Sequence, residues 1–159
     1  MITPTTFTVP METPIGTLVL ESDGEMLTGI WLPTQRRKAA GRGADAPPVL
    51  KDTATQLEEY FAGERTEFDV PMELDGTAFQ KEVWGELRRI PYGETISYGE
   101  LARNVGRPNG PRAVGQANGR NPIPIIVPCH RVVASNGIGG YGGGLPMKRA
   151  LLAVEGVTM

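Results

Sequence analysis

Hydrophobic residues near the start of the chain fall in short runs that are separated by turn signals. Three runs carry β-branched and apolar residues, with Thr-Pro and Asp-Gly pairs between them: residues 6–9, 16–21 and 26–32. Runs of this length and composition, bounded by such turns, are typical of β-strands. The pattern predicts a small antiparallel sheet in the first part of the chain.

A loop and then a helix are expected after the sheet. Residues 33–48 are polar and rich in Pro and Gly, which predicts a mobile loop. Between residues 49 and 62 the apolar side chains recur at the spacing of one helical face: Leu50, Ala54, Leu57 and Phe61. Gly63 follows where such a helix is expected to end.

A second domain is predicted from residue 76 onward. Thr77 begins a T-x-x-Q capping box, and the apolar residues after it share one helical face: Phe79, Val83, Leu87 and Ile90. Ser97 and Glu100 form another capping-box pattern, at the start of a short helix. After a glycine-containing turn, a further helix is expected from Pro111 to about residue 118. The two short helices predict a helix-turn-helix, although many helical hairpins bind nothing.

These elements predict an α+β fold in two domains. The N-terminal domain, residues 1–75, contains a small antiparallel sheet and a helix. The C-terminal domain, residues 76–159, is mostly helical and contains the helix-turn-helix. A length of 159 residues fits either one domain or two small ones.

Composition and charge narrow the classes of protein that this chain can be. No apolar run approaches the roughly 18 residues that span a bilayer, and no secretory signal is visible, so we expect a cytoplasmic protein without a membrane partner. Residues 1–78 hold 13 acidic and 6 basic residues, a net charge of −7, whereas residues 79–159 hold 5 acidic and 10 basic residues, a net charge of +5. This asymmetry suggests that the second half meets a polyanion, or that charges segregated by chance.

The second helix of the predicted helix-turn-helix, PRAVGQANG, has an unusually smooth surface. Arg112 is its only charged residue, and small residues surround it. A helix that reads the major groove usually carries several long polar side chains. A smooth helix with one long side chain suits the minor groove and insertion into the base stack. The alternative is that the small residues only allow close packing between helices.

The single cysteine and the single histidine are neighbours, Cys129 and His130. Residues 125–128 are predicted to form a short buried strand that ends at this pair. A lone cysteine is most often a small buried apolar residue, but Arg131 and a nearby cation would favour its nucleophilic thiolate form. Because neighbours on an extended chain point to opposite sides, we expect His130 to act on Cys129 through a water molecule.

Residues that follow the Cys-His pair add to a candidate catalytic site. Six glycines lie between residues 137 and 144, with Tyr141 among them. Such a segment is either a disordered loop or a close backbone approach to a flat ligand. Glu155 is the only acidic residue after Glu100, and a buried carboxylate there would orient an imidazole, as in a Cys-His-acid relay.

Three runs of the second half give the chain a specific resemblance: IPYGETISYGELA, RAVGQANGRNPIPIIVPCHRVV and GGYGGGLPMKRALLAVEG. They closely resemble the C-terminal domain of the O6-alkylguanine-DNA alkyltransferases, whereas the first half is similar to that family's N-terminal domain only in outline. The resemblance implies direct DNA repair by a single, irreversible transfer of an alkyl group from guanine O6 to a cysteine. O4-alkylthymine is a further candidate substrate.

The resemblance also implies a role for each matching residue of the catalytic site. Cys129 would accept the alkyl group, His130 would take the thiol proton through a water molecule, and Glu155 would hold His130. Asn121 would support the turn around the site. Tyr98 would donate a proton to the guanine leaving group and press on a phosphate as the nucleotide rotates out.

The implied DNA contacts and base pocket complete this set of residues. Arg112 would fill the gap that a flipped nucleotide leaves in the stack. The expected DNA-binding residues are Arg112, Ala113, Gly115, Tyr98, Ser97 and Arg131. The expected pocket residues are Val132, Tyr141 and Gly142. Family members often have serine at the position of Gly142. Glycine has no hydroxyl, so any hydrogen bond that the serine makes in those proteins must come from the backbone here.

No metal or organic cofactor is expected. Some relatives hold a structural zinc in the N-terminal domain, but the only cysteine and histidine of this chain belong to the predicted site. The expected partner is double-stranded DNA that carries O6-alkylguanine, bound by a monomer, and cooperative binding along DNA stays open. Two other functions compete. One is a damage-binding protein without transfer activity, in which the cysteine of the motif is replaced. The other is a thiol hydrolase that uses Cys129, His130 and Glu155.

Overall fold

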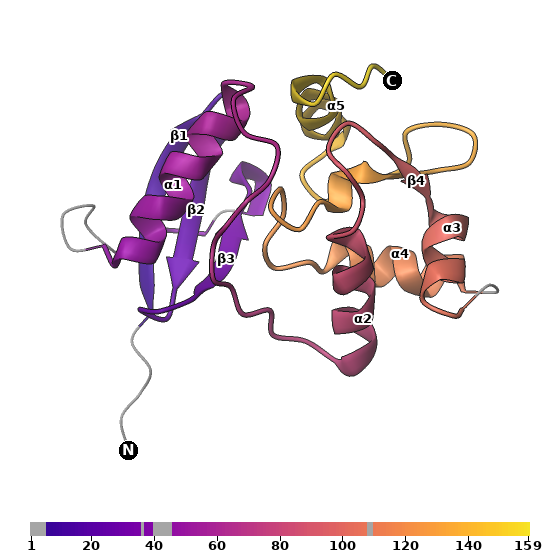
Figure 1. Cartoon of the computed structure of the whole chain (residues 1–159), viewed down its shortest axis with the longest axis horizontal. Coiled ribbons are helices and arrows are strands. Elements are labelled where there is room, and N and C mark those ends of the chain that lie inside the picture. Colours follow the sequence, from indigo (N-terminus) through magenta and orange to yellow (C-terminus); the bar gives the residue numbers. More distant parts are fainter. Residues whose placement is uncertain (1–5, 36, 40–45, 108–109) are drawn as a thin grey trace. The chain divides into compact units, whose positions relative to one another are not determined.

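The computed structural model of the chain describes residues 6–35, 37–39, 46–107 and 110–159. These residues form two compact units, residues 1–74 and residues 75–159. The first unit holds the sheet, and the second holds most of the helices (Figure 1). The predicted α+β fold is confirmed, and each unit is described by itself below.

In the described part of the first unit, a three-stranded antiparallel sheet packs against an α-helix. The strands are β1 (Phe7–Thr13), β2 (Gly16–Ser22) and β3 (Leu27–Trp31), in the order β1-β2-β3. Helix α1 (Pro48–Phe61) packs on this sheet (Figure 1). Its buried face supplies the core residues Val49, Leu50, Thr53, Leu57 and Tyr60.

Two predictions for the first unit need adjustment. Strand β1 runs on to Thr13, beyond the predicted end at residue 9, because Pro10 lies on an edge strand, where a missing N–H is tolerated. The predicted loop 33–48 begins with a 3₁₀ turn, η1 (Pro33–Gln35). The Gln35 side chain accepts a hydrogen bond from the Leu32 N–H at 2.7 Å. Arg37 then pairs with Glu21 at 3.1 Å. Residues 36 and 40–45 of this loop lie outside the described residues.

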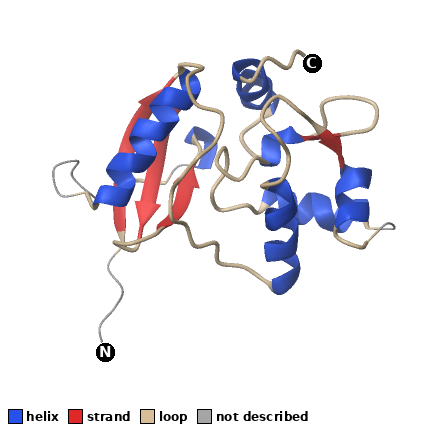
Figure 2. Ribbon diagram, viewed as in Figure 1, coloured by secondary structure: helices blue, strands red, loops and turns tan. Residues whose placement is uncertain are grey.

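The described residues of the second unit form five helical segments and two short strands, and helices dominate this unit (Figure 2). In chain order they are α2 (Ala78–Leu87), β4 (Ile96–Ser97), α3 (Tyr98–Asn104), α4 (Pro111–Gly119), η3 (Cys129–Arg131), β5 (Val132–Val133) and α5 (Leu145–Val154). Helix α4 packs against α2 and α3, and β4 pairs with β5 in parallel. The helix-turn-helix corresponds to α3 and α4, and residues 108–109 of its turn lie outside the described residues.

The predicted capping box at Thr77 is complete, whereas at Ser97 only the half made by the hydroxyl is present. The Thr77 hydroxyl accepts a hydrogen bond from the Gln80 N–H at 3.1 Å, and the Gln80 side chain accepts one from the Thr77 N–H at 2.9 Å. The Ser97 hydroxyl likewise accepts from the Glu100 N–H at 3.0 Å. These bonds satisfy N–H groups that a helix start leaves without a partner, so both helices begin where the sequence predicts.

The predicted strand at residues 125–128 is wrong. This segment forms tight turns instead: Ile126 N–H donates to the Pro124 carbonyl at 2.9 Å, and Val127 N–H donates to the Ile123 carbonyl at 3.0 Å. Pro124 and Pro128 have no N–H to give to a ladder, so an extended pairing is unavailable to them. The apolar side chains that suggested a strand, Ile125, Ile126 and Val127, are buried within these turns.

Candidate active site

Cys129 begins the 3₁₀ turn η3, which places it differently from the end of an extended strand. The residue is 6% exposed, and its N–H donates to the Val127 carbonyl at 2.8 Å. Burial raises the pKa of the Cys129 thiol, while hydrogen bonds from Asn121 and Tyr141 and the charge of Lys148 act in the opposite direction. The thiol therefore stays protonated at rest and needs a base to become a thiolate.

His130 is the titratable base next to Cys129 in the chain. Its side chain is fully buried, and Nε2 lies 2.6 Å from Oε2 of Glu155. Burial lowers the pKa of His130, although Glu155 opposes this shift. The other ring nitrogen, Nδ1, is buried and has no hydrogen-bond partner among the described residues. A neutral imidazole with a free ring nitrogen is able to accept a proton.

The Glu155 carboxylate forms hydrogen bonds with Arg131, Gly93 and His130. Oε1 accepts from Arg131 Nε at 2.8 Å and from the Gly93 N–H at 3.1 Å. Oε2 accepts from Arg131 Nη2 at 3.1 Å and faces His130. With both oxygens engaged, the carboxylate is fixed in one orientation and in turn fixes the imidazole ring.

Arg131 is buried, whereas a contact with DNA was expected for it. The residue is 6% exposed; besides its two bonds to Glu155, Nη1 donates to the Ile90 carbonyl at 2.7 Å. Its guanidinium also lies over the Tyr92 ring at 5.8 Å. A buried carboxylate requires a counter-charge, and Arg131 supplies it. A guanidinium held in this way is not available to phosphate, so the structure corrects the prediction for Arg131.

Asn121 holds the turns that precede the cysteine, where the resemblance placed it. Its amide donates to the Val127 carbonyl at 2.7 Å and its oxygen accepts from the Ile123 N–H at 2.9 Å. Ile125, within these turns, has the left-handed φ of 75°, which is rare for a β-branched residue. The two bonds of Asn121 thus stabilise the turns that hold Ile125 in this strained conformation.

Tyr98, the first residue of α3, lies beside the glycine-rich segment. Its hydroxyl donates to the Gly140 carbonyl at 3.4 Å, and burial raises its pKa, with the proximity of Cys129 acting in the same direction. Gly139 has φ +75°, and a Cβ built there would lie 3.1 Å from Cε2 of Tyr98. Glycine at residue 139 therefore allows the ring to lie against the backbone.

The three pocket residues differ in burial. Val132 is fully buried, Tyr141 is partly buried and interacts with Cys129, and Gly142 is exposed. A Cβ built at Gly142 meets nothing within 4 Å, so the serine that family members often carry would fit there.

Comparison with known proteins gives both units the same assignment. Residues 7–74 match the family described as "6-O-methylguanine DNA methyltransferase, ribonuclease-like domain", and residues 78–157 match "6-O-methylguanine DNA methyltransferase, DNA binding domain". The chain belongs to the 6-O-methylguanine DNA methyltransferase family. The resemblance found in the sequence is confirmed, and it extends over the first unit as well.

Individual members of this family are similar over nearly the whole chain. The methylated-DNA–protein-cysteine methyltransferase of Mycobacterium tuberculosis (strain ATCC 25618 / H37Rv) is 50% identical over 147 residues, which cover 91% of this chain and 89% of the relative. The constitutive enzyme of Bacillus subtilis (strain 168) is 42% identical over 154 residues, 92% of this chain and 93% of the relative. The crystal structure of Mycobacterium tuberculosis OGT in complex with DNA matches with a TM-score of 0.84 at 49% identity and covers 94% of this chain and 91% of that one.

The family's DNA-binding domain contains the remaining predicted residues: three on α4, and Ser97 at the end of β4, where it caps α3. Arg112 and Ala113 are exposed, and Gly115 and Ser97 are partly exposed. Gly115 lies next to the Tyr98 ring, where a Cβ would make ordinary contact at 3.7 Å. Trp84 Nε1 donates to the Ala117 carbonyl at 2.8 Å and ties α4 to α2. One side of α4 is therefore packed against α2, and its other side, with the small residues and Arg112, is exposed.

Two residues near Cys129 escaped the sequence analysis. Asn118, on α4, is 5% exposed and its amide donates to the Cys129 carbonyl at 3.4 Å. Lys148, on α5, is fully buried. A signal for Lys148 exists in the sequence: it shares one helical face with Leu151, Leu152 and Glu155, so a lysine occupies the buried stripe of this helix.

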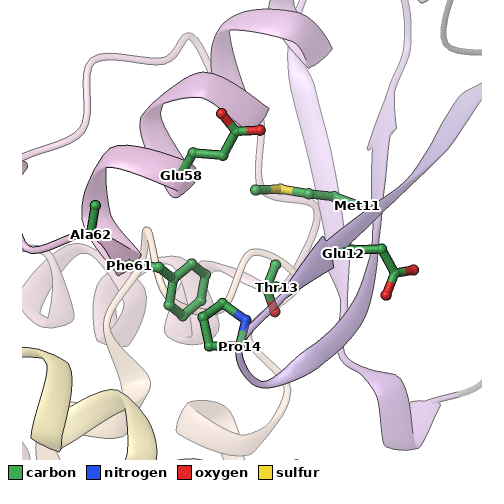
Figure 3. Close-up of a pocket in the computed structure, with 7 residues that line it drawn as sticks. All are labelled: Met11, Glu12, Thr13, Pro14, Glu58, Phe61 and Ala62. Carbon is green, nitrogen blue, oxygen red and sulfur yellow. The ribbon is translucent and has the colours of Figure 1, made fainter.

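Other features of the described residues add no chemistry to the site. A cavity of about 300 Å³ in the first unit is lined by residues of β1, the β1–β2 turn and the end of α1 (Figure 3): Met11, Glu12, Thr13, Pro14, Glu58, Phe61 and Ala62. It includes none of the predicted site residues. Within residues 6–35, 37–39, 46–107 and 110–159, no group of three or more His, Cys, Asp or Glu side chains is placed to hold a metal ion. No helix in the same ranges is long and apolar enough to cross a membrane.

Proposed function

We propose that this chain repairs DNA directly by moving an alkyl group from O6 of guanine in a duplex to the sulfur of Cys129. The observation that carries the proposal is the buried relay of Cys129, His130 and Glu155 in a member of this family. The relatives named as methylated-DNA–protein-cysteine methyltransferases support the same reaction.

The relay accounts for the activation of the thiol. His130 is neutral near pH 7 because burial lowers its pKa, so its free Nδ1 takes the proton of Cys129 through a water molecule. Glu155, only 2.6 Å from Nε2, stabilises the imidazolium that forms. The Lys148 ammonium favours the thiolate. The resting thiol is thus converted to a soft nucleophile only within the site.

The transfer itself exchanges one bond to the alkyl carbon for another. The thiolate of Cys129 attacks that carbon, the S–C bond forms, and the C–O6 bond of guanine breaks. Tyr98 donates a proton to the departing guanine and recovers one from the imidazolium through solvent. A thioether has no good leaving group, and the chain has no second cysteine, so each molecule acts once.

DNA binding is assigned to the outward side of α4. The basic excess lies in the second half of the chain, and α4 offers small residues with a single long cation, Arg112. Such a surface approaches the minor groove closely, and Arg112 takes the place of the extruded nucleotide. The solved complex of a relative with DNA supports DNA as the partner.

Mass analysis of the intact protein tests the proposal. After mixing with a duplex that carries one O6-methylguanine, each protein molecule is expected to gain the mass of one CH₂ group, and peptide analysis should place it on Cys129. Repeated turnover with unmodified Cys129 would favour a hydrolase instead. Tight binding to the lesion with no gain in mass would favour a damage-binding protein.

Replacement of Arg112 by alanine tests the base-flipping role. Extrusion of a base costs a few kcal/mol, and a free alkylated base avoids this cost. We expect Arg112→Ala to slow repair of duplex DNA by roughly 10- to 100-fold and to leave the reaction with a free O6-alkylguanine base unchanged. Arg120→Ala, at the other end of α4, controls for the loss of one exposed positive charge. Equal losses on both substrates would assign Arg112 to the chemical step or the fold.

A further inference from the structure

Lys148 is a buried cation that the reaction described above does not require as an acid, a base or a nucleophile. Its side chain is completely inaccessible, and in the described part of the chain it forms no ion pair with a carboxylate. Instead Nζ donates to three backbone carbonyls: Val132 at 2.7 Å, Ile138 at 2.6 Å and Gly140 at 3.0 Å. An ammonium has three hydrogens, so every one of them is used.

The three carbonyls belong to two segments that are separate in the chain. Val132 lies on β5, directly after the turn that holds Cys129, whereas Ile138 and Gly140 lie in the glycine-rich segment 137–144. Glycine backbones lose much conformational entropy when they are ordered, and this segment has six of them. Lys148 therefore supplies a three-way link that holds an intrinsically flexible segment against β5.

That segment positions both tyrosines of the site. The Gly140 carbonyl that binds Lys148 also accepts the hydrogen bond of Tyr98. The Tyr98 ring lies against Gly139, between the two anchored carbonyls. Tyr141, one residue farther along, interacts with Cys129. Displacement of the segment would move the proton donor for guanine and a neighbour of the nucleophile together.

We propose that Lys148 is a positioning residue for alkyl transfer, whose ammonium fixes segment 137–144 against β5 and so keeps Tyr98 and Tyr141 in place beside Cys129. This inference rests on the function proposed above. Under this proposal, a residue outside the Cys-His-Glu relay controls the geometry of the pocket.

The protonation state of Lys148 gives the proposal a signature. Burial lowers the pKa of Lys148 to about 8. The titratable groups that interact with its charge are Cys129 and His130 on η3, and Tyr98 shares the Gly140 carbonyl with it, while the neighbouring Arg149 is exposed. A neutral amine has only two hydrogens, so above pH 8 one carbonyl loses its donor and the segment loosens.

The pH dependence of the wild-type rate follows from these two opposing titrations. Ionisation of Cys129 makes the rate rise with pH, because its thiol is protonated at rest. Loss of the Lys148 proton makes the rate fall above about pH 8. If the charge of Lys148 affected neither the segment nor the thiolate, the rate would continue to rise until Tyr98 ionises, and burial raises the pKa of Tyr98 above its ordinary value of 10.0. Hydrogen exchange in the segment separates these two effects of the charge, because only the loss of positioning increases it.

Single-turnover kinetics with an O6-methylguanine duplex test this role in the full chain. Lys148→Met is expected to lower the rate constant at saturating DNA about 100-fold, the loss typical of a reacting geometry displaced by about 1 Å. The DNA concentration at half-saturation should stay within about 2-fold, because the α4 surface is untouched. Hydrogen exchange should increase in residues 134–144. Arg149→Met, the exposed neighbour on α5, is the matched control and should change neither measurement.

The Lys148→Arg variant separates charge from packing. A guanidinium keeps its charge beyond pH 12. The rate constant of this variant should therefore not fall above pH 8, even if its maximum value differs from that of the wild type. Wild-type transfer that rises steadily through pH 9 would overturn the proposal, even where Lys148→Met fails to fold. So would a Lys148→Met protein that reacts as fast as Arg149→Met. Absence of alkyl transfer to wild-type Cys129 at any pH would instead overturn the proposed function.

Discussion

Replacement of Glu155 by alanine is expected to lower the free energy of unfolding by about 3–5 kcal/mol, the usual cost of leaving a buried charge without its partner. The Arg131 guanidinium would lose both bonds to the carboxylate while remaining inside the unit. His130 would lose the group that orients it. Urea denaturation at pH 7 measures the change.

Two further variants distinguish this buried pair from a general effect of removing a carboxylate. Glu82→Ala, at an exposed position of α2, should change the free energy of unfolding by less than about 0.5 kcal/mol. The double variant Arg131→Met with Glu155→Leu removes both charges and should recover much of the loss. A loss below about 1 kcal/mol for Glu155→Ala would show that Arg131 finds another partner.

Replacement of Cys129 by serine is expected to abolish alkyl transfer, with a fall in rate on the order of 10³-fold or more. Burial already raises the pKa of the thiol, and a hydroxyl in the same place is still harder to ionise. DNA affinity should remain within about 3-fold, because the serine changes neither α4 nor its packing. Gel-based repair assays and fluorescence anisotropy measure the two quantities.

The outcome of this substitution separates the competing functions. Cys129→Ala serves as the matched control, since it removes the polar atom altogether. Transfer by the serine variant at a rate near that of the wild type would show that the alkyl group goes elsewhere. A loss of DNA binding in both variants would mean that the Cys129 side chain supports the fold of the unit, because the bond from Asn118 reaches the backbone carbonyl, which both variants keep.

The features that the sequence predicted well depend on neighbours within a few positions. The capping box of Thr77 and Gln80 and the helical stripe of α1 involve residues three or four apart, so their spacing alone identifies them. The pairing of His130 with Glu155 spans 25 positions. The scarcity of acidic residues after Glu100 suggested Glu155 as the partner, and the resemblance to a known family gave the same pairing.

The features that the sequence missed depend on backbone atoms that the residue types do not reveal. Lys148 binds three carbonyls, and every residue has a carbonyl, so no pattern of side chains marks its partners. Arg131 was expected to contact DNA, but Glu155 and the Ile90 carbonyl hold it inside the second unit. The apolar run at residues 125–128 has the composition of a strand, but the prolines at positions 124 and 128 deny it a regular ladder.

The bonds of Asn121 also bear on how long an unused molecule survives. Asparagine ages by deamidation, in which the backbone nitrogen of the next residue attacks the side-chain amide and a succinimide ring closes. The next residue here is Pro122, whose nitrogen carries no hydrogen to lose, and both ends of the Asn121 amide are already bonded. By contrast, Asn136 is exposed and precedes Gly137, the pairing in which this ring closes most readily. In a protein consumed by its single reaction, Asn136 is thus open to slow deamidation, whereas the asparagine that supports the turns before the reactive cysteine is protected against it.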